Sequence, residues 1–132
     1  MPAHEVIKTD AGPGAIGPYS QAVKLPVGDK SLVFVAGQIA LDPATGELTG
    51  GTVGEQADRA MRNVQGILEA AGSSLDRVVK TTIFLADMDD FVEVNEAYGA
   101  YFDAAPPARA TVAVSGLPKG VDVEIEVLAY AD

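Results

Sequence analysis

Pro106–Tyr130 reads Pro-Pro-Ala-Arg-Ala-Thr-Val-Ala-Val-Ser-Gly-Leu-Pro-Lys-Gly-Val-Asp-Val-Glu-Ile-Glu-Val-Leu-Ala-Tyr, which predicts two β-strands joined by a short Gly/Pro-containing turn. From Val121 to Val127 apolar and acidic residues alternate, so we expect one apolar face and one face of carboxylates. In the preceding strand, Arg109 alternates with apolar neighbours. If both apolar faces point to one core, Arg109 and the carboxylates lie on the same side of the sheet. An arginine beside glutamates, away from the core, is the first candidate for chemistry.

Apolar and β-branched runs elsewhere in the chain predict four more strands. We expect them near residues 5–8, 20–25, 31–38 and 77–85. A loop separates the first two, because residues 11–20 contain three glycines and two prolines. A hairpin turn is expected at residues 27–30. Gly37, near the end of its strand, suggests a β-bulge or a close backbone approach.

Two amphipathic helices are predicted between these strands. Thr52 and Glu55 form a capping-box signature that opens a helix of about 19 residues, and Gly72 supplies its stop. A second helix is expected to begin in the acidic segment 87–90. Its apolar stripe comprises Phe91, Val94, Tyr98 and Phe102.

The order of elements, β-β-β-α-β-α-β-β, predicts an α+β fold and a single domain over residues 1–132. Two helices can cover only one face of a sheet of about six strands. The strands at 31–38 and 77–85, however, are apolar on both faces. We therefore expect another subunit to bury the second face, since a large apolar patch would otherwise remain exposed.

Composition narrows the possible functions. The net charge of −10 disfavours binding to nucleic acid or to anionic membranes. There is no cysteine, and the one histidine, His4, lies near the N-terminus, so thiol, catalytic-triad and His-rich metal chemistry are not expected. Because no long apolar run occurs, we expect a soluble, cytoplasmic protein. The lack of cysteine and of further histidines leads us to expect no metal site.

Six short motifs resemble those of one known family. They are Gly17-Pro18-Tyr19-Ser20-Gln21, Gly37-Gln38-Ile39, Phe91-x-x-x-Asn95-x-x-Tyr98, Pro107-Ala108-Arg109, Gly116-Leu117-Pro118-Lys119 and Val123-Glu124-Ile125-Glu126. Together they resemble the RidA (YjgF-like) enamine/imine deaminase family over residues 5–130. The resemblance implies a chorismate mutase-like fold of the bacillus type, with a six-stranded mixed sheet and two helices on one face. It also implies a homotrimer with ligand sites in the clefts between subunits.

The resemblance assigns roles to particular residues. It implies that Arg109 binds a substrate carboxylate, which the planar guanidinium suits, and that Glu124 is the general acid/base. Glu126, on the same face, is the competing candidate. Taken alone, Arg109 could instead be a sheet arginine paired with either glutamate. The remaining family positions near the ligand are the catalytic Tyr19 and the substrate-binding Gly37, Asn95 and Thr111.

This chain departs from the family pattern at two places. Ala36 stands where the family often has serine, so a hydroxyl contact is lost and only backbone donors serve there. The loop at residues 103–107 is shorter than in many relatives and has Pro106 where an aromatic residue is common.

The implied reaction is hydrolysis of a small, carboxylate-bearing imine or enamine, such as 2-aminoacrylate, to a 2-keto acid and ammonia, without a cofactor. One alternative is a non-catalytic module that binds keto acids or amino acids; it would need Arg109 but not Glu124, so Glu124→Gln separates the two. Another is a ribonuclease or translation inhibitor, an activity attributed to some relatives, which the net charge disfavours.

Overall fold

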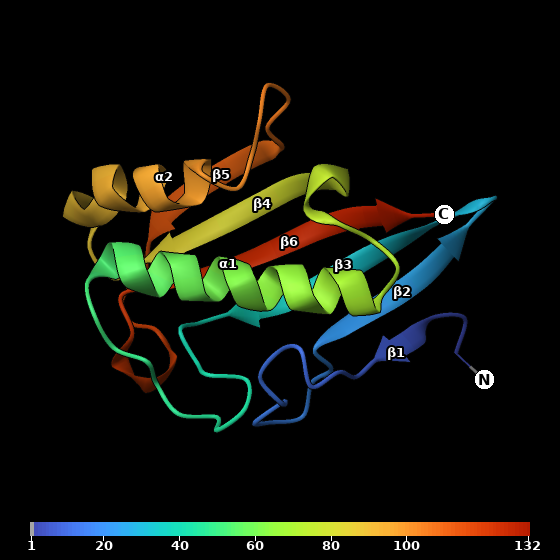
Figure 1. Cartoon of the computed structure of the whole chain (residues 1–132), viewed down its shortest axis with the longest axis horizontal. Coiled ribbons are helices and arrows are strands. Elements are labelled where there is room, and N and C mark those ends of the chain that lie inside the picture. The colour runs from blue at the N-terminus through green and yellow to red at the C-terminus, as the bar shows by residue number, and fades with distance from the viewer. Residues whose placement is uncertain (1) are drawn as a thin grey trace.

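The computed structural model describes residues 2–132 and shows one mixed sheet with two helices lying across the same face (Figure 1). The elements are β1 (Glu5–Ile7), β2 (Ala22–Val27), β3 (Lys30–Gln38), α1 (Val53–Ala70), β4 (Val78–Leu85), α2 (Phe91–Gly99), β5 (Ala108–Ala113) and β6 (Val123–Ala131). The predicted order of strands and helices is therefore confirmed. The six strands lie in the order β1-β2-β3-β6-β4-β5, and only β4 and β5 run parallel.

The first helix begins where the capping box predicts. The Thr52 hydroxyl accepts a hydrogen bond from the Glu55 amide at 3.2 Å, and the Thr52 amide donates to the Glu55 carboxylate at 3.0 Å. The helix ends at Ala70, and Gly72 then adopts a φ of +79°, a left-handed conformation that glycine favours. Within residues 2–132, neither helix is both long and apolar enough to cross a membrane.

The core lies between the helices and the sheet. From α1 and its C-cap it takes an apolar stripe of Ala57, Met61, Val64, Ile67, Leu68 and Ala71. From the centre of the sheet it takes the residues that face the helices, including Val33, Ile83 and Ile125. The second helix follows a 3₁₀ turn over Met88–Asp90 and contributes Val94 and Tyr98.

The alternation over β6 is confirmed, but the face assigned to β5 is wrong. Val123, Ile125 and Val127 are buried towards the helices, as predicted. In the parallel β4–β5 ladder, however, Arg109 pairs with Thr81, which is fully buried on the same helix-covered face. Arg109 therefore faces α2, whereas the carboxylates of β6 point to the opposite, open face of the sheet.

The connection between β5 and β6 explains part of this error. These two strands are neighbours in sequence but not in the sheet, because β4 lies between them. The connection over residues 114–122 crosses β4 and includes a 3₁₀ turn at Pro118–Gly120, so it is longer than the short turn that was expected. β5 is consequently an edge strand, and its apolar residues do not have to point to the core.

The face of the sheet away from the helices carries exposed apolar side chains, as the sequence predicts, beside the carboxylates of β6. Phe34 and Val112 are 42% and 43% exposed there, and Leu32, Phe84 and Leu128 are half-buried around them. The register places Phe34 opposite Leu128, and Phe84 opposite both Glu124 and Val112. Side chains of β3, β6, β4 and β5 thus form one surface, which is called the open face below.

The segment that enters the predicted 11–20 loop packs directly on α1. A methyl group added at Gly66 would collide with the backbone carbonyl oxygen of Ala11. Gly99, in α2, has free space at the same position. Gly66 lies within α1 against this loop, whereas Gly99 is the last residue of α2 and has no such neighbour.

We expect Gly66→Ala to lower the free energy of unfolding by about 1–3 kcal/mol, because the loop must move away from the helix. Gly99→Ala is the matched control and should be neutral or stabilising by up to about 1 kcal/mol, since alanine favours the helix. Urea unfolding followed by circular dichroism measures both values. Equal stability of the two variants would show that Ala11 does not pack on Gly66.

Candidate active site

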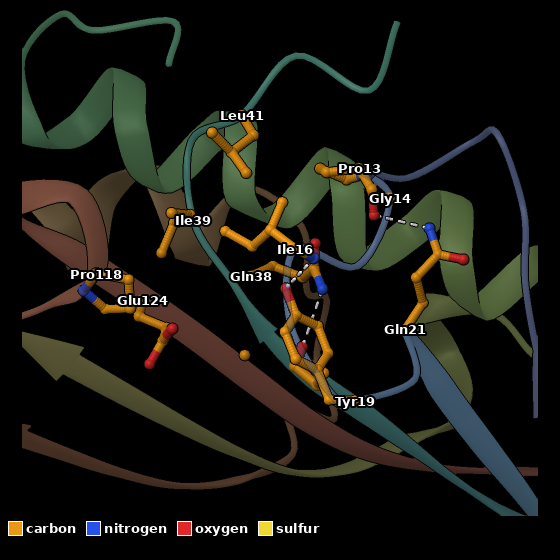
Figure 2. Close-up of a pocket in the computed structure, with 12 residues that line it drawn as sticks. Pro13, Gly14, Ile16, Tyr19, Gln21, Gln38, Ile39, Leu41, Pro118 and Glu124 are labelled. Carbon is orange, nitrogen blue, oxygen red and sulfur yellow. Dashed lines mark hydrogen bonds between the residues drawn. The ribbon is translucent and has the colours of Figure 1, made fainter. Parts of the chain in front are cut away.

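A cavity of about 320 Å³ lies where the 11–20 loop, the end of β3 and the beginning of β6 meet (Figure 2). Its wall is mostly apolar, and Glu124 contributes a carboxylate to it. The lining residues are Pro13, Gly14, Ile16, Tyr19, Gln21, Ala36, Gly37, Gln38, Ile39, Leu41, Pro118 and Glu124. Three predicted site residues, Tyr19, Gly37 and Glu124, therefore meet in one cavity.

A β-bulge shapes the floor of this cavity. Ala36 and Gly37 together lie opposite Glu126, where β3 shifts its register against β6. A Cβ atom at Gly37 would lie 2.8 Å from the carboxyl carbon of Glu124. The prediction of a bulge or a close approach at Gly37 is confirmed in both senses, because the missing side chain leaves the space that the Glu124 carboxyl group occupies.

Glu124 has an environment suited to proton transfer. Its side chain is half-buried on the open face, two residues before the exposed Glu126. Partial burial, and next the negative charge of Glu126, raise the pKa of Glu124 above its ordinary value. A carboxyl group whose pKa moves towards neutrality exchanges protons more readily at physiological pH. Of the two glutamates, Glu124 is the one that lines the cavity.

The side chain of Gln21 holds the loop that forms one wall. Its amide nitrogen donates to the carbonyl oxygens of Thr9, Gly12 and Pro13 at 2.9, 3.2 and 2.8 Å. Its carbonyl oxygen accepts from the Thr9 amide at 2.8 Å. Gln21 is only 4% exposed, so these bonds are shielded from water and satisfy a buried polar group. They fix the base of the loop to the start of β2.

Tyr19 closes the tip of the same loop. The amide of Ile16 donates to the Tyr19 hydroxyl at 3.2 Å, and the Tyr19 amide donates to the Gly17 carbonyl at 2.9 Å. The ring lines the cavity and is 49% exposed. The Tyr19 side chain thus both holds the loop and lines the cavity.

Arg109 lies in a second, separate cluster at the other edge of the sheet. Its guanidinium donates to the side-chain oxygen of Asn95 at 2.7 Å. The same group lies 5.2 Å from the ring centre of Tyr98 and 5.6 Å from that of Phe91. The Tyr98 hydroxyl is in turn hydrogen-bonded to buried Thr81 at 2.8 Å. Asn95, which was predicted to lie near the ligand, therefore contacts Arg109.

The guanidinium of this cluster has no carboxylate partner within the described residues. The expectation that Arg109 pairs with Glu124 or Glu126 is therefore wrong. The aromatic rings and Asn95 orient the guanidinium, and its remaining donors are free to meet a planar carboxylate. Thr111, two residues further along β5, has a buried hydroxyl without a hydrogen-bond partner in the described part of the chain.

The predicted residues therefore fall into two groups rather than one. Tyr19, Gly37 and Glu124 line the cavity, whereas Arg109, Asn95 and Thr111 do not. Glu124 lies on the open face of the sheet, and Arg109 faces α2 on β5, with β4 between their strands. One chain alone does not bring the arginine to the glutamate.

Sequence reasoning gave no role to several residues that build the cavity. Gln21 and Ile39 occur within the recognised motifs. A glutamine at the start of an apolar strand indicates a buried side chain that must form hydrogen bonds, here to the backbone of the loop. Ile16 and Leu41 carry no such signal, because loop conformation alone places them. No group of three or more His, Asp or Glu side chains in residues 2–132 is arranged to hold a metal ion.

We expect Glu126→Gln to lower the pKa of Glu124, because it removes one of the two causes of the shift. Burial remains, so the pKa should stay above its ordinary value. An NMR titration of the Glu124 carboxyl carbon measures the change. The control is Glu47→Gln, which alters an exposed loop residue outside the cavity. An unchanged pKa in Glu126→Gln would exclude coupling between the two glutamates.

Comparison with known proteins places these residues in context. The sequence model of the Endoribonuclease L-PSP family matches residues 9–131. Protein DfrA of Myxococcus xanthus is 53% identical over 98% of this chain and 97% of its own length. The human 2-iminobutanoate/2-iminopropanoate deaminase is 50% identical over 94% of this chain and 88% of its own length.

The fold is shared as well as the sequence. A crystal structure of TdcF from E. coli, described with bound serine, superposes with a TM-score of 0.87 at 42% identity. The match covers 97% of this chain and 99% of TdcF. Sequence and structure agree over nearly the whole chain, which belongs to the RidA (YjgF-like) family, also described as Endoribonuclease L-PSP.

Proposed function

We propose that this protein is an imine deaminase, which hydrolyses small 2-imino acids and their enamines, such as 2-aminoacrylate, to 2-keto acids and ammonia. The observation that carries the proposal is Glu124, a carboxyl group of raised pKa in the wall of an apolar cavity. Relatives add support, because the human and mouse proteins, each 50% identical, are named 2-iminobutanoate/2-iminopropanoate deaminase.

The chemistry requires one water molecule and proton transfer. Glu124 takes a proton from water as the oxygen adds to the imine carbon, which gives a carbinolamine. The carbon–nitrogen bond then breaks as a proton reaches the nitrogen, and ammonia leaves with the 2-keto acid as the other product. Atoms balance as imine plus water gives ketone plus ammonia. Because water adds to an imine carbon unaided, we propose a reaction without a metal or an organic cofactor.

Binding of the substrate is assigned to the second cluster. The guanidinium of Arg109 binds the substrate carboxylate with two parallel hydrogen bonds, and Asn95 keeps the guanidinium oriented. Tyr19 and backbone groups at Gly37 and Thr111 order the rest of the site. Because an imine already hydrolyses in water, the protein needs to supply only positioning and a proton relay.

Arg109 and Glu124 can act on one substrate only if two copies of the chain meet. They lie on opposite faces of one sheet, so we propose that Arg109 of one subunit closes the cavity of the next. The apolar open face supplies a surface for such an assembly. We propose a homotrimer with the chorismate mutase-like arrangement and with its sites between subunits. We place its activity in the cytoplasm, where pyridoxal-phosphate-dependent dehydratases release such imines.

The alternative is a module that binds amino acids or keto acids without converting them. The relative TdcF is described with bound serine, so a member of this family holds a small amino acid. Cleavage of RNA, which the family description suggests, has less support in this chain. Its net charge of −10 repels a phosphate backbone, and its one histidine, His4, does not line the cavity.

We expect Glu124→Gln to slow imine hydrolysis at least about 100-fold, because it removes the proton relay. Arg109→Ala should also abolish acceleration, because the carboxylate loses its partner. A serine dehydratase supplies 2-aminoacrylate, semicarbazide competes for the imine, and pyruvate is measured. Glu47→Gln and Arg62→Ala are matched controls, because both residues lie outside the cavity. Titration calorimetry with serine or pyruvate should show binding by Glu124→Gln but not by Arg109→Ala.

The outcomes separate the two functions. If the wild-type protein binds these ligands and does not accelerate pyruvate release, it is a binding module. If Glu124→Gln retains the full rate, Glu124 is not the proton relay. A full rate in Arg109→Ala would remove the carboxylate-binding role from that residue.

Mixing the two inactive variants tests whether the site is shared. When Arg109→Ala and Glu124→Gln chains are unfolded and refolded together, about one quarter of the sites should combine an intact arginine with an intact glutamate. The mixture should recover roughly that share of wild-type activity, whereas each variant refolded alone should not. No recovery from a mixture of confirmed hetero-oligomers would show that both residues serve the site from the same chain.

A further inference from the structure

The apolar wall of the cavity has no part in the proton transfer described above. Six of the lining residues are aliphatic or proline: Pro13, Ile16, Ala36, Ile39, Leu41 and Pro118. A substrate carboxylate would not be stable against this wall, because burying an unpaired charge is costly. With the carboxylate on Arg109 and the reacting carbon at Glu124, the part of a 2-imino acid that fits the wall is its side chain.

Three branched aliphatic residues of this wall differ in what else they do. Ile39 and Leu41 are 6% and 4% exposed and belong to a small core cluster with Val121 and Leu117. Ile16 is 58% exposed and belongs to neither core cluster of the described chain. Its side chain therefore contributes little to folding, although it lines the cavity.

The loop presents Ile16 to the cavity in a defined way. The Ile16 amide donates to the Tyr19 hydroxyl, and the Gln21 side chain fixes the base of the loop. In the view of Figure 2, the Ile16 side chain extends from the loop in the direction of Ile39. The bond at Ile16 uses its backbone amide, and the bonds of Gln21 are to backbone atoms of other loop residues, so a change of the Ile16 side chain removes none of them.

We propose that Ile16 determines which substrate side chains this protein prefers. It contacts the side chain of the bound 2-imino acid and favours branched aliphatic groups, such as that of the leucine-derived imine, over the methyl group of 2-iminopropanoate. The inference rests on the proposed function, since it concerns the same cavity. An aliphatic contact of this kind changes kcat/KM for the larger substrate and leaves the smaller one, which does not reach Ile16, nearly unaffected.

The test compares two imines in one assay. D-Amino acid oxidase produces the imines of D-leucine and D-alanine, semicarbazide competes for them, and release of the 2-keto acid is measured. The wild-type protein should have the higher kcat/KM for the leucine-derived imine. Ile16→Ala should lower that value about 10-fold and should change the value for the alanine-derived imine less than about 2-fold.

Two further variants make the test specific. Ile16→Phe should narrow the cavity, and it should lower kcat/KM for the leucine-derived imine while the alanine-derived imine is still hydrolysed. Val27→Ala is the control, because Val27 is 52% exposed at the other end of β2 and lies outside the cavity. It should leave both substrates unchanged.

The results distinguish this inference from the function on which it rests. Unchanged selectivity in Ile16→Ala and Ile16→Phe, in a protein that hydrolyses both imines, would overturn the role of Ile16 alone. Equal loss for both substrates would also overturn it, because that pattern shows a general effect on the loop. A wild-type protein that accelerates neither imine would overturn the deaminase function together with the selectivity.

Discussion

Two helices can cover only one face of a six-stranded sheet, and most features of this protein follow from that limit. Both helices pack on the face that contains Val33, Ile83 and Ile125. The other face keeps Phe34 and Val112 more than two-fifths exposed. Since burial of apolar surface is the main favourable term in folding and association, such a face favours contact with another molecule. One face of the sheet is buried in the core of the subunit. On our proposal, the other face forms the contacts between subunits.

The same division separates the groups that could act on a substrate. Glu124 belongs to the open face, beside the bulge at Gly37, and its partial burial raises its pKa. Arg109 belongs to the covered face, where Asn95 and two aromatic rings hold it. Each group is ordered by its own neighbours before any ligand arrives. In a site shared by two subunits, one subunit would position Arg109 for binding and the other would position Glu124 for proton transfer.

Much of the fold could be predicted because the local signals are strong. The capping box at Thr52 fixes the start of α1, and strict alternation fixes the buried face of β6. The face of β5 could not be predicted, since an edge strand with apolar residues on both sides has no preferred phase. The family motifs identified Tyr19 and Glu124, whereas Ile16 enters the cavity only through the conformation of its loop.

Gly37 has no side chain, yet the position of the Glu124 carboxyl group depends on it. The space that a Cβ atom would need there is occupied by the glutamate's carboxyl group. A single methyl group at residue 37 would therefore displace a side chain that lies far along the sequence. If Glu124 acts as we propose, a substitution at this position would lower activity although the protein still folds. A glycine can thus be required because a neighbouring carboxyl group occupies the space that its side chain would need.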